Sequence, residues 1–173
     1  MARNLTPWAV TADDVPAATA AFIRRQGTTR GLDRDPLAEV THGLRVDEET
    51  MSRRPAGPRS ERHTTEMLLT PELLIISYRR GVDDDAPHVG PDARVSFHRL
   101  DQLEVATPAV GLAKRAPGAA PTPPQSVVSV TSTPLGGARR TTRHVAAGIG
   151  PEVTRFRHAL QDAVERSRRG AGA

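Results

Sequence analysis

One stretch of twelve residues, Met67–Tyr78, most constrains what this chain can fold into. It reads MLLTPELLIISY and is the densest run of large apolar residues in the sequence, interrupted only at Thr70–Glu72. Pro71 has a fixed φ and no amide hydrogen, so it does not fit inside a paired strand. The β-branched and aromatic residues after it favour a strand over one apolar helix. The stretch therefore predicts a buried hairpin at the centre of a small sheet, with a tight corner at Thr70–Glu72.

Composition limits the size of the core and the chemistry open to the chain. A length of 173 residues suits one domain with flexible appendages. The hydrophobic share is 37%, with 15 prolines, 14 glycines and 3% aromatics, so Leu, Ile, Val and Ala must fill the core. There is no cysteine, which excludes disulfides, thiolate metal sites and thiol nucleophiles.

The charge pattern is basic but gives little guidance on its own. The net charge is +4, and 23 of the 24 basic residues are arginine, since Lys114 is the single lysine. Nucleic-acid binders cluster their basic residues on one face and interleave aromatic residues with them. Here a coding bias accounts for the arginines, and a nucleic-acid partner is disfavoured. The sequence holds no apolar run of the ~20 residues that span a bilayer and no secretory h-region, so we expect a cytoplasmic protein.

Residues typical of helix ends predict two helices along the chain. One covers residues 11–26, with Asp14 or Thr11 as its cap and Gly27 just past its end. The other opens at Pro151 and carries one apolar stripe, in which Phe156 is the central anchor. The stripe consists of Val153, Phe156, Leu160, Ala163 and Val164.

The remaining segments predict short strands and connections. We expect strands at 37–49, with a bulge at Gly43, and at 93–100, 103–107, 126–133 and 140–147. Residues 1–10 are expected to be loose, and residues 51–63 to form a Pro/Gly/Arg loop. Five prolines mark 108–125 as a flexible Pro/Ala-rich insert. The predicted organisation is a tail with an accessory helix at 1–36, a domain at 37–169 and a disordered tail at 170–173.

This order of elements resembles a bacterial pleckstrin-homology-like (PH-like or GRAM-like) domain. The residues that match its "LLT-x-x-x-L" and "V-S-x-x-x-L-D-x-L-x-V" segments are Leu68, Leu69, Thr70, Leu74, Val95, Ser96, Leu100, Asp101, Leu103 and Val105. The resemblance covers about 37–166, and its motifs are mainly a hydrophobic skeleton. It implies a mainly β fold with α, a seven-stranded barrel or sandwich capped by the C-terminal amphipathic helix, plus the N-terminal accessory helix. A plain α+β sandwich with helices on one face fits the same elements.

Four arginines form the candidate site: Arg53, Arg54, Arg59 and Arg62. They lie between the first two predicted strands, where many PH domains bind inositol phosphates, and arginine suits bidentate phosphate contacts. Two prolines and a glycine separate them, however, and Glu61 offsets one charge, so a solvated loop is the simpler interpretation. A second group, Arg139, Arg140 and Arg143, surrounds a Gly-Gly turn, where a solvated hairpin tip is again simpler.

Other motifs predict no catalysis, cofactor or metal. Asp83–Asp85 lack the later ligands of a calcium loop, and an acidic tip that deters edge pairing is the better interpretation. The six histidines have no metal-binding spacing, and no nucleophile elbow or phosphate loop is present. We therefore expect a non-catalytic binding module that engages another protein. The alternative is a peripheral membrane module that binds anionic headgroups through the arginine-rich loop 53–62.

Overall fold

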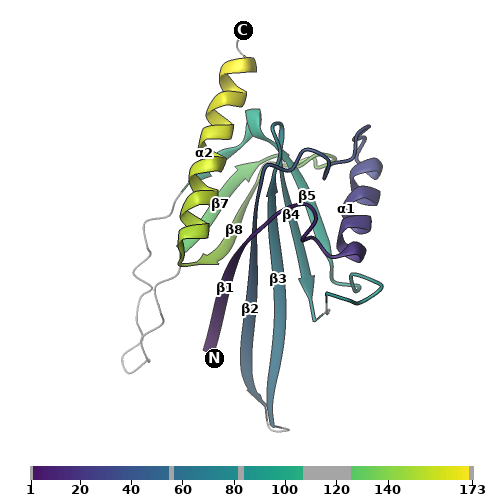
Figure 1. The fold of residues 1–173 in the computed structure, drawn as a ribbon, viewed down its shortest axis with the longest axis vertical. Helices are drawn as coiled ribbons and strands as arrows, with labels where there is room; N and C mark the ends of the chain where they lie inside the picture. The colour runs from purple at the N-terminus through teal and green to yellow at the C-terminus, as the bar shows by residue number, and fades with distance from the viewer. Residues whose placement is uncertain (1, 55–56, 82–83, 107–125, 172–173) are drawn as a thin grey trace.

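The chain forms two antiparallel sheets and two helices (Figure 1). The computed structural model describes residues 2–54, 57–81, 84–106 and 126–171; for 2–3, 52–54, 57–59 and 126 it describes the main chain alone. The five-stranded sheet has the order β1-β2-β3-β4-β5. Its strands are β1 (Ala2–Val10), β2 (His42–Arg54), β3 (Gly57–Leu69), β4 (Leu73–Arg80) and β5 (Arg94–Arg99). The second sheet consists of β6 (Glu104–Ala106), β7 (Ser126–Ser132) and β8 (Thr141–Gly148).

The expected central hairpin is confirmed as β3 and β4. The hydroxyl of Thr70 accepts a hydrogen bond from the Leu73 amide at 2.9 Å, and the Thr70 amide donates to the Leu73 carbonyl at 2.9 Å. These bonds close the corner at the position of Pro71. In β4, Leu74 and Ile76 pack on one face of the sheet and Ile75 on the other, all three buried. Burial on both faces explains why this strand reads as a continuous apolar run.

The inner cluster lies between the two sheets and the C-terminal helix α2 (Pro151–Ala171). It contains Leu44, Met67 and Leu69 from the large sheet and Val128, Val130 and Val145 from the small one. The predicted stripe of α2 is buried in the same cluster, with Phe156 2% exposed and Leu160 fully buried. The C-terminal amphipathic helix is therefore confirmed, with its predicted stripe as the buried face.

The outer cluster lies on the opposite face of the large sheet, beneath α1 (Ala17–Thr29). Ile23 of α1 packs there with Leu68, Ile75 and Phe97 of the sheet. Figure 1 shows α1 and α2 on opposite sides of the molecule. The large sheet thus has helical cover on one face and the second sheet with α2 on the other.

The N-terminal expectations were wrong in two respects. Residues 2–10 are strand β1 rather than a loose tail, and they pair with β2 from Ala2↔Met51 to Val10↔Gly43. The helix begins at Ala17 without a side-chain cap, because the Asp14 carboxylate accepts hydrogen bonds from Thr11 instead. The helix also continues past Gly27, which is buried against Leu32 and Pro36, to Thr29.

Several other boundaries also differ from the sequence-based expectation. Gly43 pairs regularly on both sides, so the predicted bulge is absent at this position. The segment 51–63 is not a loop, since β2 and β3 extend as a long hairpin around residues 55–56. The described residues hold eight strands rather than seven, because β1 was not foreseen. At the C-terminus, α2 continues through Ala171, while the insert 108–125 lies outside the described residues.

Candidate functional site

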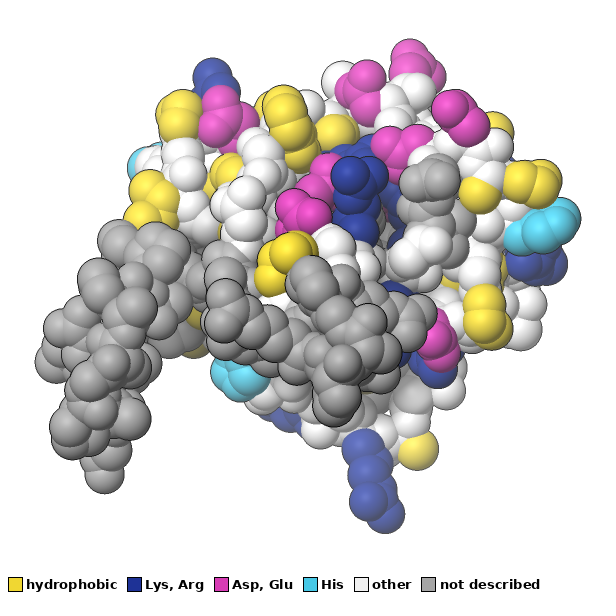
Figure 2. Space-filling view, turned by 90° about the horizontal axis from the view of Figure 1, so that it is seen from below, with side chains coloured by type: hydrophobic (Ala, Val, Ile, Leu, Met, Phe, Trp, Pro, Cys, Tyr) yellow, Lys and Arg dark blue, Asp and Glu magenta, His cyan; other side chains and the backbone are white. Residues whose placement is uncertain are grey.

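The four arginines predicted as a site lie along the β2–β3 hairpin. The main chain of Arg53 and Arg54 is at the end of β2, and that of Arg59 is at the start of β3. Their side chains are outside the described part of the structure, whereas Arg62 is described and exposed, with Glu49 as its register partner. In Figure 2, which views the molecule from below in relation to Figure 1, described arginine side chains lie next to acidic side chains on this face.

The second arginine group lies on the exposed surface. Arg139, Arg140 and Arg143 are exposed around the β7–β8 connection, and Arg140 forms an ion pair with Glu104 at 2.5 Å. Both side chains of this pair are more than half exposed, so its contribution to stability is small. These arginines fit the solvated hairpin tip that we expected as the simpler interpretation.

A buried ion pair on the α1 side of the large sheet was not foreseen. Arg79 on β4 donates from Nη2 to Oε1 of Glu66 on β3 at 3.0 Å, and both side chains are 2% exposed. Strand alternation places them on the same face as Leu68 and Ile75 of the outer cluster. The pair thus extends the face that α1 covers.

The pair is linked to Asp84, which follows β4 and the undescribed residues 82–83. Both terminal nitrogens of Arg79 donate to Asp84 Oδ1 at 3.1 Å. Arg45 on β2 makes a bidentate contact with the same carboxylate, from Nη2 to Oδ1 at 3.0 Å and from Nη1 to Oδ2 at 2.9 Å. Arg45 also donates from Nε to Asp47, which accepts a second hydrogen bond from Thr64. Two arginines therefore fix one loop carboxylate in place.

Four buried side-chain atoms of the described residues, in the ion pair and elsewhere, have no hydrogen-bond partner. These atoms are Glu66 Oε2, Arg79 Nε, Ser77 Oγ and Thr19 Oγ1. Glu66, Ser77 and Arg79 share the α1-facing side of the sheet, and Thr19 is buried on α1. A buried polar atom without a hydrogen bond costs roughly 1–3 kcal/mol. The interface between α1 and the sheet is therefore not optimised for stability at this end.

The two carboxylates of the network respond differently to their surroundings. Burial raises the pKa of Glu66 above its ordinary value, although Arg79 and Arg45 oppose this effect. Partial burial also acts to raise the pKa of Asp84, but hydrogen bonds and charges from Arg45 and Arg79 outweigh it and lower the pKa. Asp84, which is 48% exposed, is therefore a fixed and ionised carboxylate at neutral pH.

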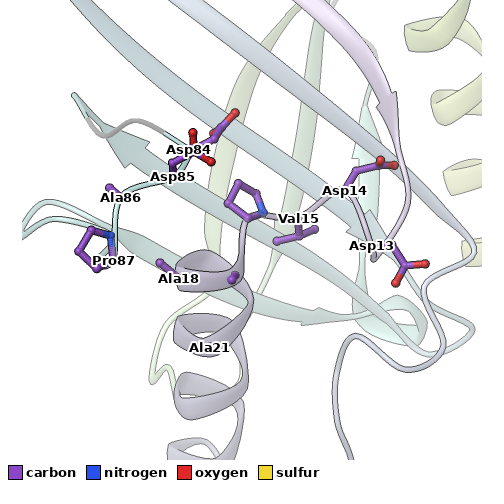
Figure 3. Close-up of a pocket in the computed structure, with 11 residues that line it drawn as sticks. Asp13, Asp14, Val15, Ala18, Ala21, Asp84, Asp85, Ala86 and Pro87 are labelled. Carbon is purple, nitrogen blue, oxygen red and sulfur yellow. The ribbon is translucent and has the colours of Figure 1, made fainter.

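Asp84 lines a groove of about 800 Å³ between the start of α1 and residues 84–87 (Figure 3). We call this the acidic groove, and its lining residues are Asp13, Asp14, Val15, Pro16, Ala17, Ala18, Ala21, Asp84, Asp85, Ala86 and Pro87. Asp13 and Asp14 lie in the segment before α1 and Asp84 and Asp85 on the opposite side, and in this view the carboxylates of Asp13 and Asp14 are directed away from Asp84 and Asp85. Hydrogen bonds from the main chain and side chain of Thr11 lower the pKa of Asp14. The lining of the groove combines four aspartates with small apolar side chains.

A second buried polar group connects the two sheets. His98 on β5 is hydrogen-bonded through Nδ1 to Ser132 on β7 at 2.6 Å and through Nε2 to Ser96 at 2.9 Å. Burial, with a smaller effect from Arg143, lowers the pKa of His98 to about 4. His98 and Ser132 are each 1% exposed, so a substrate has no access to them and the group holds the sheets together.

Sequence reasoning missed the acidic groove because its parts lie far apart in the chain. Asp84 belongs to the DDD run that we interpreted as an acidic tip, and Asp14 was expected to cap a helix. A charged residue in an otherwise apolar central strand, Arg79, was the one available signal, since unpaired charges are rarely buried. That signal indicates a buried partner but does not identify it.

Within the described residues, neither helix is long and apolar enough to cross a membrane, and no three potential ligand side chains converge to hold a metal ion. Comparison of the chain with models of known families, with curated proteins and with solved structures finds no match.

Proposed function

We propose that this chain is a cytoplasmic, non-catalytic PH-like binding module that engages another protein through the acidic groove. The proposal of a PH-like architecture is supported by the two packed sheets and by α2, whose apolar stripe fills the space between them. Because apolar side chains fill that interior, recognition takes place on the surface.

One observation carries the proposal: Asp84 is held in the groove wall by Arg45 and by the buried Arg79. Preorganised polar groups lower the cost of binding, because their conformational entropy is lost on folding rather than on association. Trp8 adds support, since it is 52% exposed and its register partner on the same face is Arg45. Exposed tryptophan is enriched among residues that dominate protein interfaces.

The test is affinity capture from cells of the source organism with three forms of the full chain. Ala21 is exposed and lines the groove, so Ala21→Arg fills and partly neutralises it. Gln161→Arg places the same side chain on the exposed face of α2 and serves as the matched control. We expect one protein to be retained by the wild type and the control and lost with Ala21→Arg. Equal retention by all three forms would contradict the proposal.

A second candidate is the anionic-membrane module, favoured by the position of the arginine-bearing β2–β3 hairpin. Figure 1 shows the described ends of β2 and β3 extending beyond the rest of the sheet, so this end of the sheet would meet a flat surface first. Sedimentation with phosphatidylserine vesicles tests it, with Arg53, Arg54, Arg59 and Arg62 replaced by Gln as the comparison. Salt-sensitive vesicle binding that the Gln variant loses supports the membrane function, whereas no binding by the wild type excludes it.

A further inference from the structure

We propose that the first half of β8, Thr141–His144, binds an acidic peptide segment that pairs with it as an added strand. We call this half of the strand the β8 edge. The inference goes beyond the proposed function, because the β8 edge contains no residue that lines the acidic groove. It follows from the unpaired main chain of β8, from the way the other sheet edges are covered and from the arginines beside this edge.

The main chain of the β8 edge is open on one side. Among the described strands, β8 ends the order β6-β7-β8 and pairs with β7 alone. Every second residue of such a strand directs its N–H and C=O away from the sheet. All four residues are exposed, and their register with β7 is regular from Ser132↔Thr141 to Ser129↔His144. The β8 edge therefore presents hydrogen-bonding groups in the geometry that an added strand requires.

The other described edges are less open. Pro7 lies within β1 and offers no amide hydrogen, which interrupts the ladder with an added strand. On β5, the Phe97 carbonyl accepts a hydrogen bond from the Leu135 amide at 2.9 Å. The Val95 carbonyl accepts one from Arg30 at 3.5 Å. Since β6 has only three residues, the β8 edge is the one best suited to strand addition.

The charge beside this edge selects an acidic partner. Arg139 precedes β8 and Arg143 lies within it, and both are exposed. Neither forms an ion pair or hydrogen bond with another described residue, whereas Arg140 pairs with Glu104. A glutamate or aspartate opposite Arg143 on an added strand forms a cross-strand pair of opposite charge. Complementary charge at an interface favours such a segment over a basic one.

The same arginines disfavour a second copy of this chain as the occupant. Pairing of two β8 edges brings the arginines of both chains to one short stretch of sheet, and facing like charges are destabilising. Charged residues on edge strands are a common protection against such self-association. An acidic segment replaces this repulsion with attraction, so the β8 edge suits a partner of opposite charge.

The experiment measures fluorescence anisotropy of three labelled, end-capped octapeptides titrated with the full chain. The first alternates glutamate with valine, which places all its carboxylates on one face of an extended strand. The second has lysine in place of glutamate. The third has the sequence of the first with a methyl group on every amide nitrogen, which keeps the charge and removes the main-chain donors. The three peptides thus separate strand addition from charge attraction.

Two double variants locate the binding surface. Arg139→Gln combined with Arg143→Gln is the edge variant, which removes two charges and leaves the main chain of β8 in place. Arg166→Gln combined with Arg169→Gln removes the same charge from the exposed face of α2 and is the matched control.

We expect the wild type and the α2 control to bind the glutamate peptide, and to bind the lysine and methylated peptides at least about tenfold more weakly. The edge variant should bind the glutamate peptide roughly fivefold more weakly than the control, the loss expected for two exposed charge pairs.

Three outcomes would overturn the inference. Equal affinity for the glutamate peptide and its methylated form would mean charge attraction without strand addition. Equal affinity of the edge variant and the α2 control would place the binding surface elsewhere, and no measurable binding by the wild type would leave the edge without this ligand. If affinity capture still depends on Ala21 in any of these cases, the proposed function stands while this inference fails.

Discussion

Arg79 and Glu66 form an ion pair of 3.0 Å in which both side chains are 2% exposed, yet each retains a buried polar atom without a partner. They occupy neighbouring strands in diagonal positions, since Arg79 lies opposite Thr64 and Glu66 lies opposite Ser77. A pair in this state does not add much stability over apolar side chains of similar size. Its more direct effect is to anchor Asp84, the loop carboxylate that lines the acidic groove.

Removing one member of the pair should be far more damaging than removing both. Arg79→Met leaves Glu66 buried without its cation, and we expect a loss of roughly 3–5 kcal/mol in the free energy of unfolding. Arg79→Met with Glu66→Met should restore most of that loss, because no uncompensated charge stays buried. Urea unfolding of the wild type, both single variants and the double variant completes the cycle. A double variant as unstable as the sum of the singles would mean that the two side chains are not coupled, and would contradict this account.

Local sequence signals predicted the elements that depend on few distant contacts. Pro71 marked the corner of the central hairpin, and the stripe around Phe156 marked the buried face of α2. Both signals are contained within one turn or one helix. Strand β1 gave no such signal, because its residues are ordered by pairing with β2, some forty residues away in the register.

The acidic groove could not be predicted for the same physical reason. Asp84 becomes a site residue only when β2, β3 and β4 align Arg45, Glu66 and Arg79 on one face. The helix start then brings Asp13 and Asp14 to the other wall. Register and loop placement determine these relations, and neither follows from composition or periodicity.

Phe156 provides the clearest test of how α2 is held. Phe156→Ala removes a ring that is 2% exposed in the inner cluster, and we expect a loss of roughly 3–5 kcal/mol. Gln161→Ala changes an exposed residue of the same helix and should alter stability by no more than about 0.5 kcal/mol. Urea unfolding compares the two. Small and equal losses would mean that α2 does not stabilise the sandwich by packing.

Gly43 should not tolerate even one added carbon. A Cβ at this position would lie 2.5 Å from the main-chain oxygen of Val10 and 2.8 Å from a methyl carbon of that residue. Because β1 is paired to β2 here, Gly43→Ala must push the end of β1 away, and we expect a loss of roughly 1–3 kcal/mol. Hydrogen exchange locates the effect, with faster exchange expected in β1 than in β4. Unchanged exchange in β1 would contradict this account.

His98 should make the fold sensitive to mild acid. Burial lowers its pKa from 6.5 to about 4 in the folded protein, while the unfolded chain keeps the ordinary value. Above pH 6.5 both states hold a neutral imidazole, and His98 imposes no penalty. As the pH falls from 6.5 toward 4, the unfolded state binds a proton that the folded state does not. Stability is therefore lost across this window, by up to about 3 kcal/mol.

Urea unfolding at a series of pH values between about 7 and about 4 measures this effect. Asn keeps one hydrogen-bonding group near Ser132 and does not titrate, so His98→Asn is the matched variant. We expect it to be less stable than the wild type at neutral pH, because it loses one of two hydrogen bonds and part of the ring packing. Its stability should then fall less steeply with acid, because the imidazole whose pKa burial lowers is absent. Parallel pH profiles for the two proteins would show that protonation of His98 is not what weakens the junction between the sheets.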